Sequence, residues 1–232
     1  MAVEEPIKQS LTGLMSSMRI TPEEIELRKH YLEFEAGDEA RLKAVNELAR
    51  NYAEPVIEAF YRHLTSFDDT KAFFSNPATL ERVKRLQVQY FLRLTQGTYD
   101  AAYVEERLKI GAVHERIGLD VKYYLGSYNL YLREVATRLF GAYPDDVDTA
   151  IEAYLSLMKL VFLDIGLAID TYIFQRERTI SLQQEEIAKQ RSKELERLAE
   201  LERFQKLTVG RELKMIELKK EIEELKKGPP KE

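Results

Sequence analysis

Histidine and cysteine, the side chains that most often ligate metals, are scarce in this sequence. Only three histidines, His30, His63 and His114, occur among the 232 residues, and there is no cysteine. A metal centre built from several histidines is therefore close to excluded. Disulfides, zinc–thiolate sites, thiol nucleophiles and a Cys-x-x-Cys-His haem attachment are excluded outright. The lack of cysteine also fits a reducing cytoplasm.

His114 is the histidine whose surroundings permit chemistry. It lies among Ile110, Val113 and Ile117 on the apolar face of an expected helix. A lone histidine in such a place is commonly a core residue with satisfied nitrogens. The alternative is a metal ligand, because a single neutral imidazole in an apolar, helical pocket is what haem iron needs as a fifth ligand. Spacing alone leaves both interpretations open.

The elements that must position His114 are predicted to be helices, packed into an all-α body over residues 20–175. Residues 21–24 (TPEE) combine a Thr N-cap, a Pro and a Glu in the pattern of a capping box. We expect this helix to run to about residue 36 and to be closed by Gly37. Asp38 should cap a second helix, which should kink or break at Pro55.

Further helix starts follow along the chain. Each has a capping side chain ahead of an apolar, helically spaced run, and these are Asn76, Asp100, Asp120 and Asp145. The last helix of the body should run from residue 147 through 174. No stretch alternates with period two for long enough to propose a sheet.

Composition and charge exclude several partners. The chain has 35 Lys and Arg against 40 Asp and Glu, a net charge of −5, which gives no reason to expect a nucleic-acid partner.

The acidic start of the sequence lacks the features of a secretory signal. The most apolar stretch, residues 153–174, carries Lys159, Asp164 and Asp170. Three such charges each cost roughly 2.5–3.5 kcal/mol in a bilayer, so we expect no membrane insertion and a cytoplasmic location.

The two ends of the chain differ from the body. Residues 1–19 show no periodicity, and we expect a flexible N-terminal segment. Residues 176–227 are rich in Glu, Lys, Arg, Gln and Leu, with a narrow apolar seam that predicts a coiled-coil helix. The seam slips around residues 207–210, which suggests a stutter or local unwinding. A solvated single helix is the alternative, but so narrow an apolar face favours self-association. Residues 228–232 are a short tail.

Three sequence segments carry a resemblance to a known family. Residues 110–119 (IGAVHERIGL), followed by residues 122–126 (KYYLG), resemble the F-helix and following segment of globin-coupled sensors, and residues 59–64 (AFYRHL) look like the family's B-helix motif. The resemblance covers residues 20–175. It implies a sensor globin fold, haem b (iron protoporphyrin IX) as cofactor, and His114 as the proximal iron ligand.

The resemblance also implies roles for residues around the haem. Tyr61 matches the distal Tyr, whose hydroxyl would donate a hydrogen bond to a dioxygen ligand. Val83 and Leu86 match distal positions of the E helix; some relatives place a Thr where Leu86 falls, so a second polar donor is absent there, and the adjacent Gln87 is expected to turn away. Tyr124 matches a Tyr near the proximal His and could hydrogen-bond its free nitrogen.

Each of these tyrosines could instead be an ordinary core residue. Further pocket walls are expected from apolar and aromatic side chains, namely Phe60, Phe74, Tyr90, Ile110, Val113 and Leu119. His30 and His63 are expected at the surface.

The functional expectation is a regulatory sensor of a diatomic gas, O2 or else CO or NO, and not an enzyme. The last two helices of the body carry more apolar surface than one globin needs, which predicts a homodimer through these helices and the coiled coil. The coil would pass the state of the haem to a signalling partner protein or to an output domain absent from this sequence. One alternative is a haem-free interaction module with the same fold. Another is a haem enzyme such as an NO dioxygenase, for which no reductase domain or distal His is present.

Overall fold

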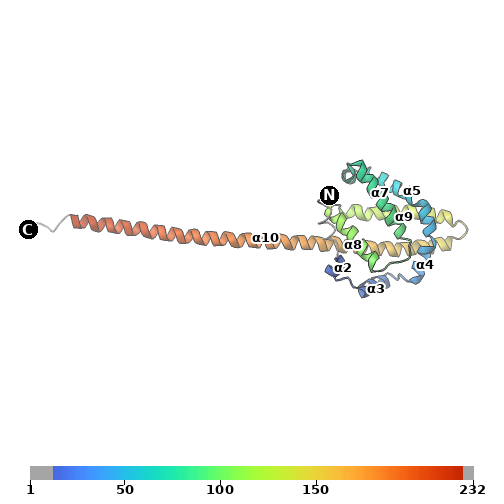
Figure 1. Ribbon diagram of the computed structural model, residues 1–232, viewed down its shortest axis with the longest axis horizontal. Helices are drawn as coiled ribbons and strands as arrows, with labels where there is room; N and C mark the ends of the chain where they lie inside the picture. The colour runs from blue at the N-terminus through green and yellow to red at the C-terminus, as the bar shows by residue number, and fades with distance from the viewer. Residues whose placement is uncertain (1–12, 227–232) are drawn as a thin grey trace, which may run out of the picture. The chain divides into compact units, whose positions relative to one another are not determined.

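The structure describes residues 13–226, and helices make up most of that range. This computed structural model contains no strand within that range, so the predicted all-α class is confirmed. The chain divides into two compact units, residues 1–176 and residues 177–232 (Figure 1). Each unit is described by itself below.

The first unit is built from helices of very different length. They are α2 (Leu14–Ser17), α3 (Pro22–Tyr31), α4 (Ala36–Ala44), α5 (Asn46–Leu64), α6 (Asp68–Lys71), the 3-10 turn η1 (Ala72–Phe74), α7 (Pro77–Arg93), α8 (Ala101–Arg116), α9 (Val121–Ala142) and the first part of α10 (Val147–Lys226). Their buried faces form one main apolar core.

Most predicted helix starts are confirmed, because each depends on a local hydrogen bond. The side chain of Thr21 accepts from the backbone N–H of Glu24 at 3.3 Å. The side chains of Asn76, Asp100 and Asp120 cap α7, α8 and α9 in the same way. For α10, the carboxylate that accepts from the backbone N–H of Thr149 belongs to Asp146, one residue later than predicted.

The first two predicted helices are bounded differently. The helix α3 ends at Tyr31, because Glu33 adopts a left-handed backbone with φ of 52°. Gly37 lies inside α4, so it does not end the preceding helix. Asp38 is not the N-cap: its carboxylate accepts from the N–H of Glu35, the true cap. Pro55 sits within α5, which runs past it without a break.

Part of the N-terminal segment expected to be flexible belongs to the core. Residues 14–17 form the single turn α2, and Leu14 is buried. The backbone N–H of Met15 donates to the carboxylate of Glu105 on α8 at 3.2 Å. A helix of one turn is too short for apolar periodicity to reveal. Residues 1–12 lie outside the described residues.

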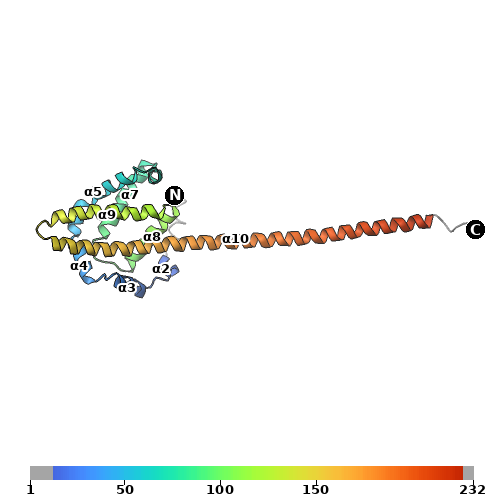
Figure 2. The same cartoon turned by 180° about the vertical axis from the view of Figure 1, so that it is seen from behind.

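The helices α9 and α10 run antiparallel and side by side within the first unit (Figures 1 and 2). Two ring pairs fix this register: Phe140 with Tyr154 at 6.2 Å between centroids, and Tyr124 with Tyr172 at 6.0 Å. The helix α8 packs closely on α10 at Gly111. A Cβ built there would lie 3.0 Å from that of Thr171. His114, three residues after Gly111, is thereby held near α10.

The second unit consists of the rest of α10. From residue 177 the helix continues to Lys226, and its side chains are exposed through residue 223. The backbone stays helical at residues 207–210, so the local unwinding suggested there is absent. No helix in the described part of the chain combines the length and hydropathy needed to cross a membrane.

Candidate functional site

His114 is a neutral, half-buried imidazole near the end of α8. Burial lowers its pKa to about 4, although the Ile110 carbonyl one turn earlier favours the protonated ring. Its Nδ1 atom is buried and makes no hydrogen bond to any described residue. Its ring lies 5.2 Å from that of Tyr124 on α9, between centroids. An uncharged imidazole with an unpaired nitrogen is a ready metal ligand.

Tyr61 lies in a cluster of aromatic side chains from three helical segments. Its ring meets Phe74 of η1 edge-on at 5.4 Å and the neighbouring Phe60 at 5.3 Å. Burial raises the pKa of Tyr61 well above its usual range, so the phenol keeps its proton. No hydrogen bond joins its hydroxyl to another of residues 13–226, so this donor is free to bind a ligand.

Tyr131 on α9, which sequence reasoning missed, lies between Tyr61 and the ring pair of His114 and Tyr124. Its ring stacks on Phe60 at 4.6 Å. Its pKa is raised well above the usual value, mainly by burial, and the hydroxyls of both Tyr61 and Tyr124 add to the shift. The structure therefore brings the distal and proximal candidates into one region. Helical spacing could have found it, since Tyr124, Tyr128 and Tyr131 share one buried face of α9.

On α7, Val83 is placed as expected, but the neighbours Leu86 and Gln87 have exchanged their expected orientations. Val83 is half-buried, but Leu86 is 56% exposed. Gln87, expected to turn away, points inward and donates to the Tyr131 hydroxyl at 2.5 Å. The reason is helical geometry: Gln87 is four residues after Val83 and three before Tyr90, so all three share a face. A polar side chain of α7 thus does reach Tyr131, whose ring stacks on Phe60 beside Tyr61.

The other predicted wall residues differ in burial. Ile110 and Leu119 are half-buried, and Val113 is 40% exposed. The Leu119 carbonyl accepts a hydrogen bond from Tyr172 of α10 at 3.2 Å. Tyr90 hydrogen-bonds within the core and is not a simple apolar wall. His30 and His63 are exposed, as expected.

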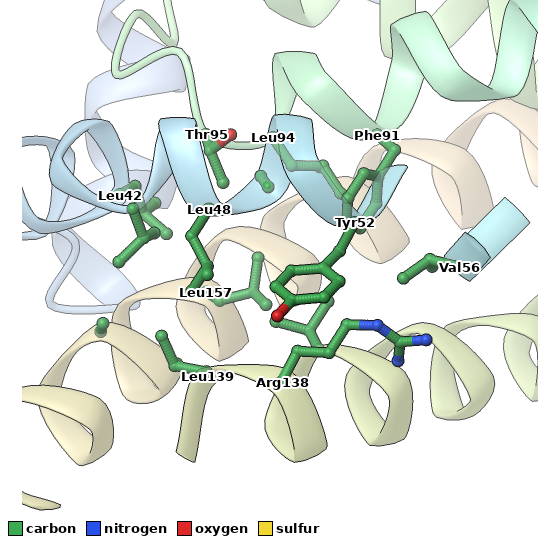
Figure 3. Close-up of a pocket in the computed structure, with 14 residues that line it drawn as sticks. Leu42, Leu48, Tyr52, Val56, Phe91, Leu94, Thr95, Arg138, Leu139 and Leu157 are labelled. Atoms are coloured by element: carbon green, nitrogen blue, oxygen red, sulfur yellow. The ribbon is translucent and has the colours of Figure 1, made fainter. Parts of the chain in front are cut away.

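A separate apolar cavity of about 40 Å³ lies in the same unit, between α4, α5, α7, α9 and α10 (Figure 3). Its lining includes neither His114 nor Tyr61. Figure 3 shows Tyr52 and Arg138 beside it, and the Arg138 guanidinium lies 5.6 Å from the Tyr52 ring centroid. The guanidinium is paired with Glu134 at 2.7 Å. This cavity offers no metal ligand, so it is not the candidate site.

The chemistry of the His114 region suits a haem. Its polar groups are one neutral imidazole with an unpaired nitrogen and the protonated phenol of Tyr61, with apolar and aromatic side chains around both. A haem iron is held axially by one such imidazole, and its ring requires an apolar surround.

Comparison with known proteins agrees with this chemistry. The sequence model of the family described as Protoglobin matches residues 21–178. The chain is 31% identical over 186 residues to the "Heme-based aerotactic transducer HemAT" of Halobacterium salinarum (strain ATCC 700922 / JCM 11081 / NRC-1). That match covers 74% of this chain and 37% of the relative, so the chain spans little more than a third of its length.

A solved structure supports the fold. The globin domain of a globin-coupled sensor from Geobacter sulfurreducens superposes with a TM-score of 0.61 at 22% identity, over 63% of this chain and 96% of that one. At this identity the likeness establishes a globin fold alone. Since the family match extends over most of the chain, the protein belongs to the Protoglobin family.

Proposed function

We propose that the first unit binds haem b through His114 and senses a diatomic gas, with O2 as its ligand. The observation that carries the proposal is the state of His114, a half-buried, neutral imidazole whose buried Nδ1 has no hydrogen-bond partner. The family and the heme-based transducer among its relatives support the same assignment. When bound, the haem supplies an iron atom with one open position for a gas. The protein supplies the imidazole, the dry pocket and the phenol of Tyr61.

An absorption spectrum of the reduced protein, before and after exposure to O2, tests this function. We expect a Soret band that shifts on oxygenation and returns when O2 is removed. CO should produce a distinct shift. If no Soret band forms even after reconstitution with haem, the protein is a haem-free globin instead.

Tyr61→Phe should raise the O2 dissociation rate about 10- to 100-fold, since a hydrogen bond to a partly charged ligand contributes about 1.5–3 kcal/mol. CO dissociation should change much less, because bound CO carries little charge. Stopped-flow displacement measures both rates. Tyr52→Phe on the same helix is the control, since Tyr52 borders the other cavity. Equal effects of Tyr61→Phe on both gases would contradict a donor role.

We also propose that the protein is a homodimer through α9 and α10. Large apolar side chains are exposed along one stripe of α10 at spacings of four, four, seven and eleven residues, namely Val147, Ile151, Leu155, Phe162 and Ile173. Leu125 and Phe140 are exposed on α9. The second unit adds exposed apolar residues at coiled-coil spacing, including Ile180, Ile187, Leu201, Phe204, Met215, Leu218 and Ile222. Apolar stripes of this kind are typical of helix pairs.

Leu155→Glu combined with Phe162→Glu should weaken the dimer by at least about tenfold, because two charges would be buried in each half of the interface. Sedimentation equilibrium of the full chain measures this. Leu27→Glu on α3, where Leu27 is 61% exposed, is the matched control and should leave the dimer intact. If the double variant dimerises as tightly as Leu27→Glu, the apolar stripe of α10 is not the interface.

The coiled-coil helix is the part that would carry the signal. We propose that gas binding at the haem biases α10 between two packing states, with a coupling on the order of 1–3 kcal/mol. A signalling partner or an output domain would read that bias. The role is regulatory, not enzymatic, in keeping with the transducer and sensor among the relatives.

A further inference from the structure

The segment that carries His114 is bonded to α10 on both sides of that residue. Seven residues before His114, the buried guanidinium of Arg107 pairs with the buried carboxylate of Asp164 on α10, with Nε and Oδ2 3.5 Å apart. Five residues after His114, the backbone carbonyl of Leu119 accepts a hydrogen bond from the Tyr172 hydroxyl at 3.2 Å. His114 therefore lies in a stretch of chain whose two ends are both held on α10.

Between these two bonds, the backbones of α8 and α10 approach each other closely at Gly111. A Cβ built on Gly111 would lie 3.0 Å from the Cβ of Thr171 and 3.1 Å from the Cα of Ala168. Neither atom can rotate away, because one belongs to the backbone and the other is fixed to it. A larger residue at this position must push the two helices apart, since a packed interior has no void to take up the added methyl group.

The ring of Tyr124 is a further contact between His114 and the same part of α10. It lies 5.2 Å from the His114 ring and 6.0 Å from the Tyr172 ring, between centroids. The α10 residues closest to the His114 segment thus fall within residues 168–172, about a turn and a half of helix. Because close-packed groups compress little, a displacement of His114 must change at least one contact with this turn.

We propose that residues 168–172 of α10 respond to the position of His114, and that Gly111 and Tyr172 are the positioning residues that keep the two in contact. Their role rests on the proposed function, in which His114 ligates the haem iron. Linkage is reciprocal: a gas that displaces His114 biases the packing of α10, and a change in the packing of α10 alters the gas affinity by the same factor.

Hydrogen exchange of the full chain, loaded with haem, tests this contact. Amide protection over residues 165–176 should differ about fivefold or more between the reduced gas-free protein and the O2-bound protein, the lower end of the usual range for allosteric coupling. Gly111→Ala should lose most of that difference, because the added methyl group separates α8 from α10. In resonance Raman spectra of the reduced, gas-free variant, the iron–histidine stretching band should also shift from its wild-type frequency, since His114 moves with α8.

Tyr172→Leu is a second variant, and it should lose most of the O2-dependent difference as well. It removes both the hydrogen bond to Leu119 and the ring contact with Tyr124. Gly141→Ala on α9 is the matched control for the added methyl group. A Cβ built on Gly141 meets no packed neighbour among the described residues within 4 Å, so the difference in protection and the Raman band should both stay as in the wild type.

A haem-loaded Gly111→Ala or Tyr172→Leu protein that keeps the full wild-type difference would overturn the inference alone. So would a wild-type protein that binds O2 without a change in protection over residues 165–176. Loss of the difference in Gly141→Ala would also overturn it, since the effect would then be general loosening. A wild-type protein without haem absorption overturns the proposed function and this inference together.

Discussion

His114→Ala should abolish stable haem binding. His114 is the one histidine among the described residues that is not exposed, and its ring lies 5.2 Å from that of Tyr124. Loss of a partner outside the first coordination shell typically costs about 10- to 100-fold in metal affinity, so loss of the ligand itself should cost at least about 100-fold. Titration of the haem-free variant with haem, followed at the Soret band, measures the change.

Two variants make this result specific to ligation. His63→Ala should bind haem as the wild type does, because His63 is exposed and its ring meets that of Phe67. His114→Gly should regain a five- or six-coordinate spectrum when free imidazole is added, since the imidazole can enter the space left by the ring. A His114→Ala protein that keeps the wild-type spectrum and affinity would show that another residue holds the iron.

The sequence predicted the helix starts that depend on a hydrogen bond between near neighbours in the chain. The starts at Thr21, Asn76, Asp100 and Asp120 depend on one side chain and a backbone N–H two or three residues later, so they could be read directly. Gly37 misled the same reasoning. Glycine is the usual residue of helix ends, but here Glu33 takes up the left-handed backbone and ends α3 first.

The candidate site was predictable where a short motif carried it. His114, Tyr124 and Tyr61 each lie in one of the three matched segments, and the structure places all three in one region. That region is consistent with their expected roles, which only the haem-bound protein can test. Gln87 was misjudged because its inward turn depends on the exact rotation of α7, which its one-residue offset from Leu86 decides.

The buried ion pair of Arg107 on α8 and Asp164 on α10, with Nε and Oδ2 3.5 Å apart, could not be predicted from the sequence. The partners of Asp164 lie far from it along the chain, Tyr103 at 61 residues and Tyr90 at 74. The signal was nevertheless present. Asp164 interrupts the most apolar stretch of the chain, and a carboxylate in the middle of a buried helix must have a buried partner. The identity of that partner, Arg107, depends on tertiary packing alone.

Breaking this pair from one side should cost about 3–5 kcal/mol of folding free energy, because the remaining charge is buried without a counter-charge. Asp164→Leu should show the loss at every pH, since Arg107 cannot release its proton. For Arg107→Met, by contrast, the loss of stability should depend on pH. Burial raises the pKa of Asp164, and without the arginine nothing positive opposes it. The carboxyl can then bind a proton, so this variant should be more stable at acidic pH and lose stability as pH rises through the raised pKa.

The double variant Arg107→Met/Asp164→Leu distinguishes a charge effect from lost packing. With both charges gone it should be more stable than either single variant at neutral pH, although Tyr90 and Tyr103 lose an acceptor, at about 1–3 kcal/mol each. Urea unfolding of the four proteins gives the coupling energy. Arg93→Met is the surface control: Arg93 and its partner Glu106 are 47% and 39% exposed, so the change should cost less than about 1 kcal/mol. Additive losses in the double variant would mean that Asp164 and Arg107 stabilise the core independently, and that Asp164 does not owe its ionised state to the arginine.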